Sequence, residues 1–520
     1  MKKGIIVLSA IAAIATTSFA TTNLEDRLNA MEKKILLLEQ KLISANQKLS
    51  DKLTAENKIL SKKLTKENKK LTKKINKVKA HDAKDNIKWN VDFRTAMDSI
   101  HYKHTDGTTS SNPDLLTNRL WLGMAYAPSQ NVLFKGKLSY LKAYGDTANH
   151  NQSNTNPGYA NFDWVTSENA TDNTVKVKEA YWLYKNDTLF DTEIPWTISV
   201  GRRPSTDGLG INQREGMKQN SPLSHTINVE FDGLSSKFAL DSLTGVDGMW
   251  WKLCTGRGLT NAKQRFQNDG SSYSSDDSQT HDINMYGFIF VPWDNGQYSI
   301  HTNWARAENL IGFSQDDINT YSTAVQTYNT TQNSTNYNDM VYKTPDFESF
   351  GDMDLFTAMF KAEGLGDGIN DFLDDTTLFV SWAQSKTRPK GSMLGSSSSK
   401  TGYSTWIGLN IPCLFTEDGR IGIEWNKGSK YWRSVTYGED TMAGSKIAAR
   451  GTAWEIYYDK PITKSLNFNA RYTKIKYDYT GSQAFFGDDG TPYDIDSATA
   501  IAMSSVKESS DLRVSINYKF

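Results

Sequence analysis

The 520-residue sequence is poor in cysteine and histidine, on which many catalytic and metal sites depend. Its two cysteines, Cys254 and Cys413, lie far apart and outside any C-x-x-C pattern, so the spacing of a zinc site is absent. An oxidising compartment would permit a disulfide between them, although two small apolar residues on separate strands is the simpler interpretation. The seven histidines are scattered, and neither G-x-S-x-G nor H-E-x-x-H occurs. We therefore expect no enzyme, no catalytic residues, no metal site and no cofactor.

Long hydrophobic runs are also absent from most of the chain. After residue 20, no apolar run approaches the ~20 residues of a membrane helix, which excludes a bundle of transmembrane helices. The first 20 residues differ, because the basic start MKK precedes the apolar stretch GIIVLSAIAAIA and the small residues of SFA. This pattern predicts a secretory signal peptide over residues 1–20 and a mature chain that begins at about Thr21.

The net charge of zero conceals two oppositely charged parts. Residues 21–80 carry 16 Lys and Arg against 7 Asp and Glu, whereas residues 81–520 carry 41 against 52. A basic segment therefore precedes an acidic body. We treat them as two domains, an arm over residues 21–82 and a body over residues 88–520.

Proline and glycine are missing from residues 21–80, so nothing in this segment interrupts a helix. Apolar residues recur there at alternating spacings of four and three, which is the mean period of a coiled-coil seam. The seam residues are Leu24, Leu28, Met31, Ile35, Leu38, Leu42, Ala45 and Leu49, followed after a stutter by Leu53, Leu60, Leu64 and Leu71. Because an isolated helix is marginally stable, this stripe predicts an α-helical coiled coil formed with further copies of the chain.

The end of the arm is rich in lysine, above all over residues 62–79. Such a run can bind an anionic polymer such as the cell wall, or it can be a solvated helix face. Both interpretations stay open at this point, and we expect no nucleic acid as a partner.

The body is built from segments in which apolar and polar residues alternate, as in KWNVDFRTAMDS at residues 88–99. A period of two indicates a strand with one apolar and one polar face. The sixteen segments of this kind span residues 88–98, 117–127, 131–142, 174–185, 195–203, 234–241, 248–256, 281–291, 297–307, 352–362, 376–386, 402–412, 420–427, 450–459, 465–477 and 511–520.

The connections between these segments alternate in length, since every odd one has 15 residues or more and every even one has 13 or fewer. Transmembrane β-barrels sort their loops in this way, because their periplasmic turns are short and their extracellular loops are long. Tilted strands of about ten residues also match the ~30 Å hydrocarbon core. We therefore predict an all-β transmembrane barrel of about 16 antiparallel strands. Apolar residues such as Trp89 would face lipid, and polar residues such as Asn90 a wet lumen.

Two further patterns carry a resemblance to a known class of protein. The last segment, DLRVSINYKF, alternates up to Phe520 and resembles the C-terminal signature of bacterial outer-membrane proteins. The stretches VKEAYWLY, WTISVGRR and VEFDGLSSKF resemble the EAY…VGRQ…FDG pattern of general and specific porins. With the coiled coil, the sequence resembles porin-like proteins with a periplasmic N-terminal arm. The resemblance implies a barrel among the lipids of the cell outer membrane, an arm in the periplasm and a homotrimer.

Selectivity in a porin depends on charged residues at a constriction. The connection PSTDGLGINQREGMKQNSPLSHTINVEFDG stands where porins fold a loop into the lumen, and an ordinary surface loop is the alternative. The candidate constriction residues are Arg202, Arg203, Asp207, Arg214, Glu215, Lys218 and Asp232. The candidate pore-wall residues, chosen by strand parity, are Asp92, Arg94, Glu424, Glu455, Arg471 and Arg513. These wall charges either contact solutes or brace the wall by pairing with one another.

The function that these patterns predict is passive diffusion of ions or small hydrophilic solutes through a water-filled barrel. The alternative is a structural tether, whose basic arm engages the cell wall or spaces the envelope. The acidic balance of the body favours a weak preference for cations.

Overall fold

The structure is a computed structural model that describes residues 24–85, 87–145, 174–366, 368–439 and 441–520. The predicted signal peptide lies outside the described residues. The contacts within the chain divide it into two units, Met1–Lys79 and Ala80–Phe520. The N-terminal helix and the barrel are therefore described separately.

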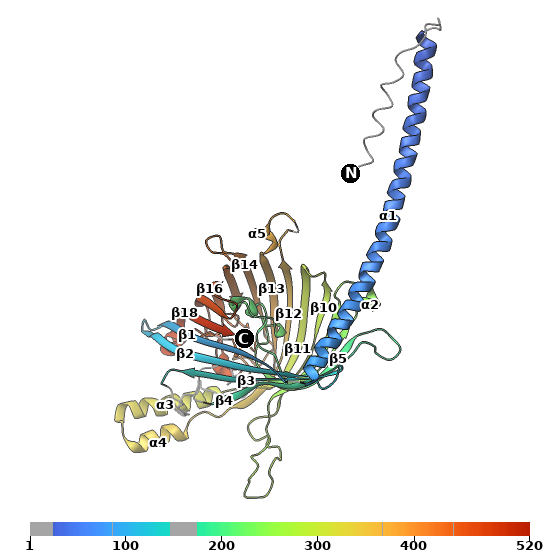
Figure 1. The fold of residues 1–520 in the computed structure, drawn as a ribbon. Coiled ribbons are helices and arrows are strands. Elements are labelled where there is room, and N and C mark those ends of the chain that lie inside the picture. Colours follow the sequence, from blue (N-terminus) through green and yellow to red (C-terminus); the bar gives the residue numbers. More distant parts are fainter. Residues whose placement is uncertain (1–23, 86, 146–173, 367, 440) are drawn as a thin grey trace. The chain divides into compact units, whose positions relative to one another are not determined.

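The N-terminal unit is a single helix, α1 (Leu24–Asp85), which is blue in Figure 1. It is about 93 Å long, taking a rise of ~1.5 Å per residue. Along the predicted seam, Leu38, Leu42 and Leu49 are 63–67% exposed. The helix is thus confirmed, and its association into a coiled coil stays a prediction. In the part of the chain that the structure describes, no helix combines the length and apolar character of a membrane span.

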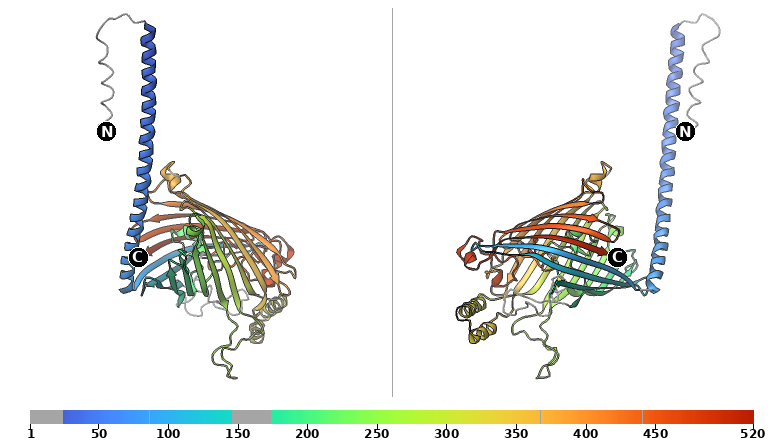
Figure 2. Two further views of the ribbon diagram at one scale, coloured as in Figure 1. Left: turned by 90° about the vertical axis from the view of Figure 1, so that its right-hand side faces the viewer. Right: turned by 60° about the vertical axis from the view of Figure 1, so that its left-hand side comes forward.

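The body is a closed antiparallel barrel of sixteen strands, which confirms the predicted fold class. The barrel strands are β1 (Lys88–His104), β2 (Thr109–Tyr126), β3 (Val132–Ala143), β4 (Val175–Asn186), β5 (Trp196–Arg203), β8 (Phe231–Ala239), β9 (Trp250–Leu259), β10 (Ile283–Asp294), β11 (Tyr298–Gly312), β12 (Glu348–Glu363), β13 (Thr377–Pro389), β14 (Thr401–Pro412), β15 (Arg420–Gly428), β16 (Gly451–Pro461), β17 (Leu466–Tyr477) and β18 (Val506–Lys519). Each strand pairs with its neighbours along the chain, and β1 pairs with β18 to close the barrel (Figure 2).

The connections contain the smaller elements. They are β6 (Gly208–Leu209), η1 (Ile211–Glu215), β7 (Ser221–Leu223), α2 (Asp241–Thr244), α3 (Gln315–Thr331), α4 (Ser334–Tyr342), α5 (Asp371–Asp374), η2 (Asp488–Gly490) and α6 (Ala498–Ala502). Helices α3 and α4 pack on each other in the connection between β11 and β12 (Figure 1). The side chain of Ser314 caps α3 by accepting a hydrogen bond from the backbone N–H of Asp317.

Each predicted segment overlaps one barrel strand, but the strict sorting of loop lengths is wrong in two places. The first connection was expected over residues 99–116, whereas β1 and β2 continue their pairing up to Lys103 and Thr109 and leave a tight turn at 105–108. The sixth long connection shrinks to residues 390–400, because β13 and β14 also extend. Residues that were expected to form these two connections therefore belong to the extended strands.

The alternation of faces follows the predicted parity. On β16, Trp454 and Ile456 are 51% and 49% exposed, whereas Glu455 between them is 1% exposed. On β15, Ile423 is exposed while its neighbour Glu424 is buried. The polar face thus points into the barrel, and the apolar face points outward.

Candidate functional site in the barrel lumen

The connection between β5 and β8, residues 204–230, crosses the interior of the barrel, and we name it the first inner connection. His225 contacts the hydroxyls of Ser381 on β13 and Ser404 on β14, at 2.8 and 2.9 Å. Glu215 of the same connection reaches Arg94 on β1, well away from β13 in the order of strands. A surface loop could not touch both walls, so this connection lies within the lumen.

Glu215 of the first inner connection contacts arginines of three strands. Its Oε1 lies 2.9 Å from Arg94 Nη1 of β1 and 3.8 Å from Arg471 Nη1 of β17. Its Oε2 lies 3.2 Å from Arg119 Nη2 of β2. All four side chains are nearly inaccessible, at 1–3% exposed. One carboxylate thus holds three guanidinium groups from three strands in a low-dielectric setting, where a buried charge requires such partners.

A second connection, residues 429–450 between β15 and β16, also enters the lumen, and we name it the second inner connection. Its Glu439 accepts a hydrogen bond from Arg214 Nη1 at 3.3 Å. Its Val435 donates a backbone hydrogen bond to the carbonyl of Thr226 at 2.8 Å. The two inner connections are therefore joined to each other by an ion pair and by backbone pairing.

The wall carboxylates Glu424 and Glu455 brace the second inner connection. Lys446 of that connection lies between them, 2.7 Å from Glu424 Oε2 and in contact with Glu455 Oε1. Trp406 Nε1 donates to Glu424 and Thr473 Oγ1 donates to Glu455, at 2.8 and 2.7 Å. These two carboxylates thus hold a residue of the connection, whereas Arg471 and Glu455, 3.8 Å apart, are a pair of wall charges.

The remaining predicted site residues are distributed as follows. Arg513 pairs with Asp98 at 2.6 Å, and Asp92 accepts from Arg119 at 3.1 Å. Arg202 lies 3.5 Å from Glu230 and 3.6 Å from Asp232, Asp207 lies 3.6 Å from Lys178, and the Arg203 guanidinium stacks 4.0 Å above the ring of Tyr181. Lys218 is exposed, and Asp232 lies on β8 with a largely exposed side chain, outside the group that the first inner connection gathers.

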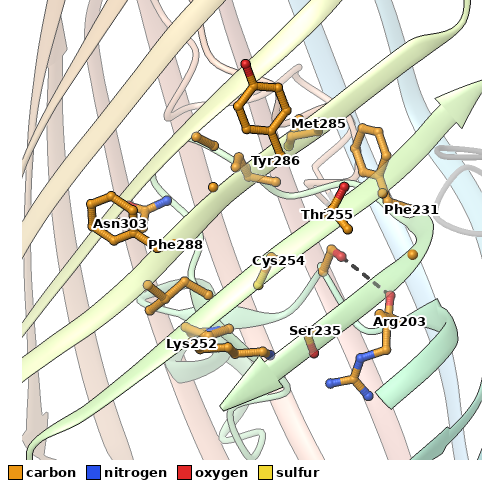
Figure 3. A pocket seen from close by; sticks show the side chains of 18 of the residues that line it. Arg203, Phe231, Ser235, Lys252, Cys254, Thr255, Met285, Tyr286, Phe288 and Asn303 are labelled. Atoms are coloured by element: carbon orange, nitrogen blue, oxygen red, sulfur yellow. Dashed lines mark hydrogen bonds between the residues drawn. The ribbon is translucent and has the colours of Figure 1, made fainter. Parts of the chain in front are cut away.

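Hollows lie beside the inner connections in the described part of the barrel, and two of them bear on the site. The larger, of about 500 Å³, lies at the ends of β12–β16 that the short turns join, and Lys218, Lys361, Arg420 and Asp459 line it. The smaller, of about 120 Å³, lies between the first inner connection and β8–β11 (Figure 3). Both are large enough for several water molecules.

The sequence analysis did not identify several charged residues of the lumen. Glu439 and Lys446 sit in a connection with no alternating pattern, so parity could not orient them. Lys178 is the extra residue at a register shift, because Lys137 pairs with Glu179 and Leu138 pairs with Val177. Both Lys178 and Glu179 are buried. Such a bulge changes the face of the residues that follow, which sequence parity does not show.

The comparisons with known proteins concern the barrel. A family model described as Protein of unknown function (DUF3373) matches residues 109–520. No curated protein matches the chain. OprB of Pseudomonas putida at high pH is 12% identical with a TM-score of 0.46, over 85% of this chain and 96% of its own. OmpF of Salmonella typhi in complex with daunomycin is 10% identical with a TM-score of 0.42, over 83% and 97%. OmpT of Vibrio cholerae, an outer membrane protein folded in vitro, is 10% identical with a TM-score of 0.40, over 84% and 97%. The closed sixteen-strand barrel itself carries the fold assignment.

We predict that Glu215→Gln lowers the free energy of unfolding by about 3–5 kcal/mol, because it leaves three buried arginines without their shared carboxylate. Equilibrium denaturant unfolding of the protein in detergent measures this change. Asp232→Asn is the matched control, since this carboxylate is 62% exposed and its loss is expected to cost less than about 1 kcal/mol. Equal losses in the two variants would contradict the role given to Glu215.

Proposed function

We propose that this chain, which belongs to the DUF3373 family of proteins of unknown function, is an outer-membrane porin for ions or small hydrophilic solutes. The observation that carries the proposal is a sixteen-strand barrel whose polar lumen is crossed by an ion-paired connection. Barrels of this size leave an aqueous channel, whereas eight-stranded barrels fill with side chains. A connection anchored inside such a channel narrows it without closing the barrel wall.

The candidate constriction is the first inner connection, and the wall residues serve as its anchors. The hollow of about 500 Å³ beside it is lined by charges of both signs, which suits hydrated solutes better than apolar ones. In this arrangement Arg94 and Arg471 set the position of the connection through Glu215. Lys218, which is exposed on that hollow, is the predicted constriction residue placed to meet a solute.

The exterior of the barrel supports insertion into the outer membrane. Large apolar side chains such as Trp89, Trp382, Trp454 and Leu512 are 40–51% exposed on the outward face, where lipid would cover them. The start of β1 and the end of the chain are joined by backbone hydrogen bonds between Val91 and Phe520, so both barrel ends lie on one side. Short turns mark the periplasmic side of such barrels, which favours an arm in the periplasm.

The exposed leucine seam of α1 supports assembly of the arm, and we propose a homotrimer held by a three-stranded coiled coil. The tether alternative lacks support of this kind. It rests on the lysine content of residues 62–79, where the side chains of several lysines lie outside the described residues.

The first test is single-channel recording of the purified full-length protein in a planar lipid bilayer. We expect stable conductance steps, since a polar lumen with water-filled hollows passes hydrated ions. A heat-unfolded sample is the control. Absence of steps from protein with intact barrel circular dichroism would refute the porin proposal.

The arm is tested by Leu42→Lys together with Leu49→Lys, which places two charges in the seam. We expect the trimer mass found by analytical ultracentrifugation in detergent to fall to that of the monomer, because a buried ammonium group disfavours the helix interface. Gln47→Lys adds a charge beside the seam and should leave the trimer intact. A trimer that survives the double substitution would show that the barrel walls, and not the arm, hold it together.

A further inference from the structure

One arc of the lumen wall carries cations that lack the ion pairs found elsewhere in the barrel. We name this group the basic arc, and its members are Lys135 on β3, Arg203 at the end of β5, Lys218 in the first inner connection, Lys237 on β8 and Lys252 on β9. In the described parts of the chain, Lys135, Lys237 and Lys252 form no ion pair with a carboxylate. By contrast, Lys137 pairs with Glu179 at 2.7 Å.

Lys237 and Lys252 are directly opposite each other in the antiparallel pairing of β8 and β9. They share the inward face with Ser235, which is 5% exposed, whereas Leu234 and Leu253 are exposed on the outer face. Like charges in directly opposed positions weaken a sheet. The pair therefore does not serve the stability of the wall, which makes a role toward a ligand the better explanation.

The surroundings of the two lysines supply little opposite charge. The Lys237 ammonium lies 4.1 Å above the ring of Trp250, and the carboxylates that act on it belong to Asp241 and Asp294 near the turns. For Lys252, the charged groups that act on it include Arg203 and Lys237, both of the same sign. The arc thus keeps a net positive field at the wall.

The basic arc borders open space. Arg203 and Lys252 line the hollow of about 120 Å³, together with the polar groups of Ser235 and Asn303 (Figure 3). Gly233, Gly256 and Gly287 of β8–β10 line the same hollow. The charge of Glu179 acts on Lys135 at the far end of the arc, together with the like charges of Lys218 and Arg203.

We propose that the basic arc binds small anions that carry a phosphate, sulfate or carboxylate group and makes the pore select for anions. Ammonium and guanidinium groups with hydroxyl and amide donors beside them match the oxygens of such anions. A low-dielectric wall with charges of one sign concentrates the opposite ion near the path. This local field opposes the cation preference expected from the acidic total charge, because that total is spread over the whole body. The inference rests on the proposed porin function.

The test compares the reversal potential in a potassium chloride gradient across a planar bilayer. We expect the unmodified protein to prefer chloride, and the combined Lys237→Gln and Lys252→Gln variant to lower the chloride-to-potassium permeability ratio about tenfold. Inorganic phosphate at constant ionic strength should block the chloride current of the unmodified protein and spare that of the variant. Lys464→Gln is the matched control, because this exposed lysine of the turn between β16 and β17 lines neither hollow.

The outcomes separate the inference from the proposed function. Two results would overturn the inference without contradicting the proposed porin function. One is conductance steps with a cation preference, and the other is an anion preference that the double variant retains. If folded protein gives no steps, the porin proposal fails, and calorimetric titration with inorganic phosphate then decides the inference alone. Phosphate binding that the double variant loses would support the basic arc, and absence of binding would overturn it.

Discussion

The arrangement of the lumen depends on a single carboxylate, that of Glu215, held among the arginines of β1, β2 and β17. Its neighbour Arg214 pairs with Glu439 of the second inner connection. Two adjacent residues of opposite charge thus fix the first inner connection, one to the barrel wall and the other to the second inner connection. Buried charges are costly without partners, so each of these groups restricts the position of the rest.

The strands of this fold could be predicted from the sequence because the two faces of the wall meet different environments. Glu424 between Ile423 and Trp425 is an example, since the acid is buried inside while Ile423 is exposed outside. Strand ends were harder to predict. Residues 99–116 are mostly polar and lack a sustained apolar alternation, yet they continue the pairing of β1 with β2. Backbone pairing extends a hairpin wherever its partner strand is in register, and hydrophobic alternation does not report this.

The contacts of the lumen could be predicted only in part. Parity placed Arg94 on the inner face, but its partner Glu215 lies 121 residues away in a connection without alternation. A face is a local property of a strand, whereas a partner across the lumen depends on the closure of the whole barrel. The bulge beside Lys178 adds a second obstacle, because it brings two consecutive residues, Lys178 and Glu179, to the buried side. The contacts that depend on barrel closure and on bulges therefore could not be predicted from the sequence.

The charges of the lumen divide by whether they have protein partners. Paired charges such as Lys446 with Glu424 and Glu455 are buried and hold the inner connections in place. Lys252 has no carboxylate partner among the described residues and lines the hollow of about 120 Å³, where a solute can supply the missing counter-charge. A count of acidic and basic residues adds both kinds together, although a paired charge contributes little field to a passing ion. The selectivity of such a barrel should therefore follow its unpaired lumenal charges and not its isoelectric point.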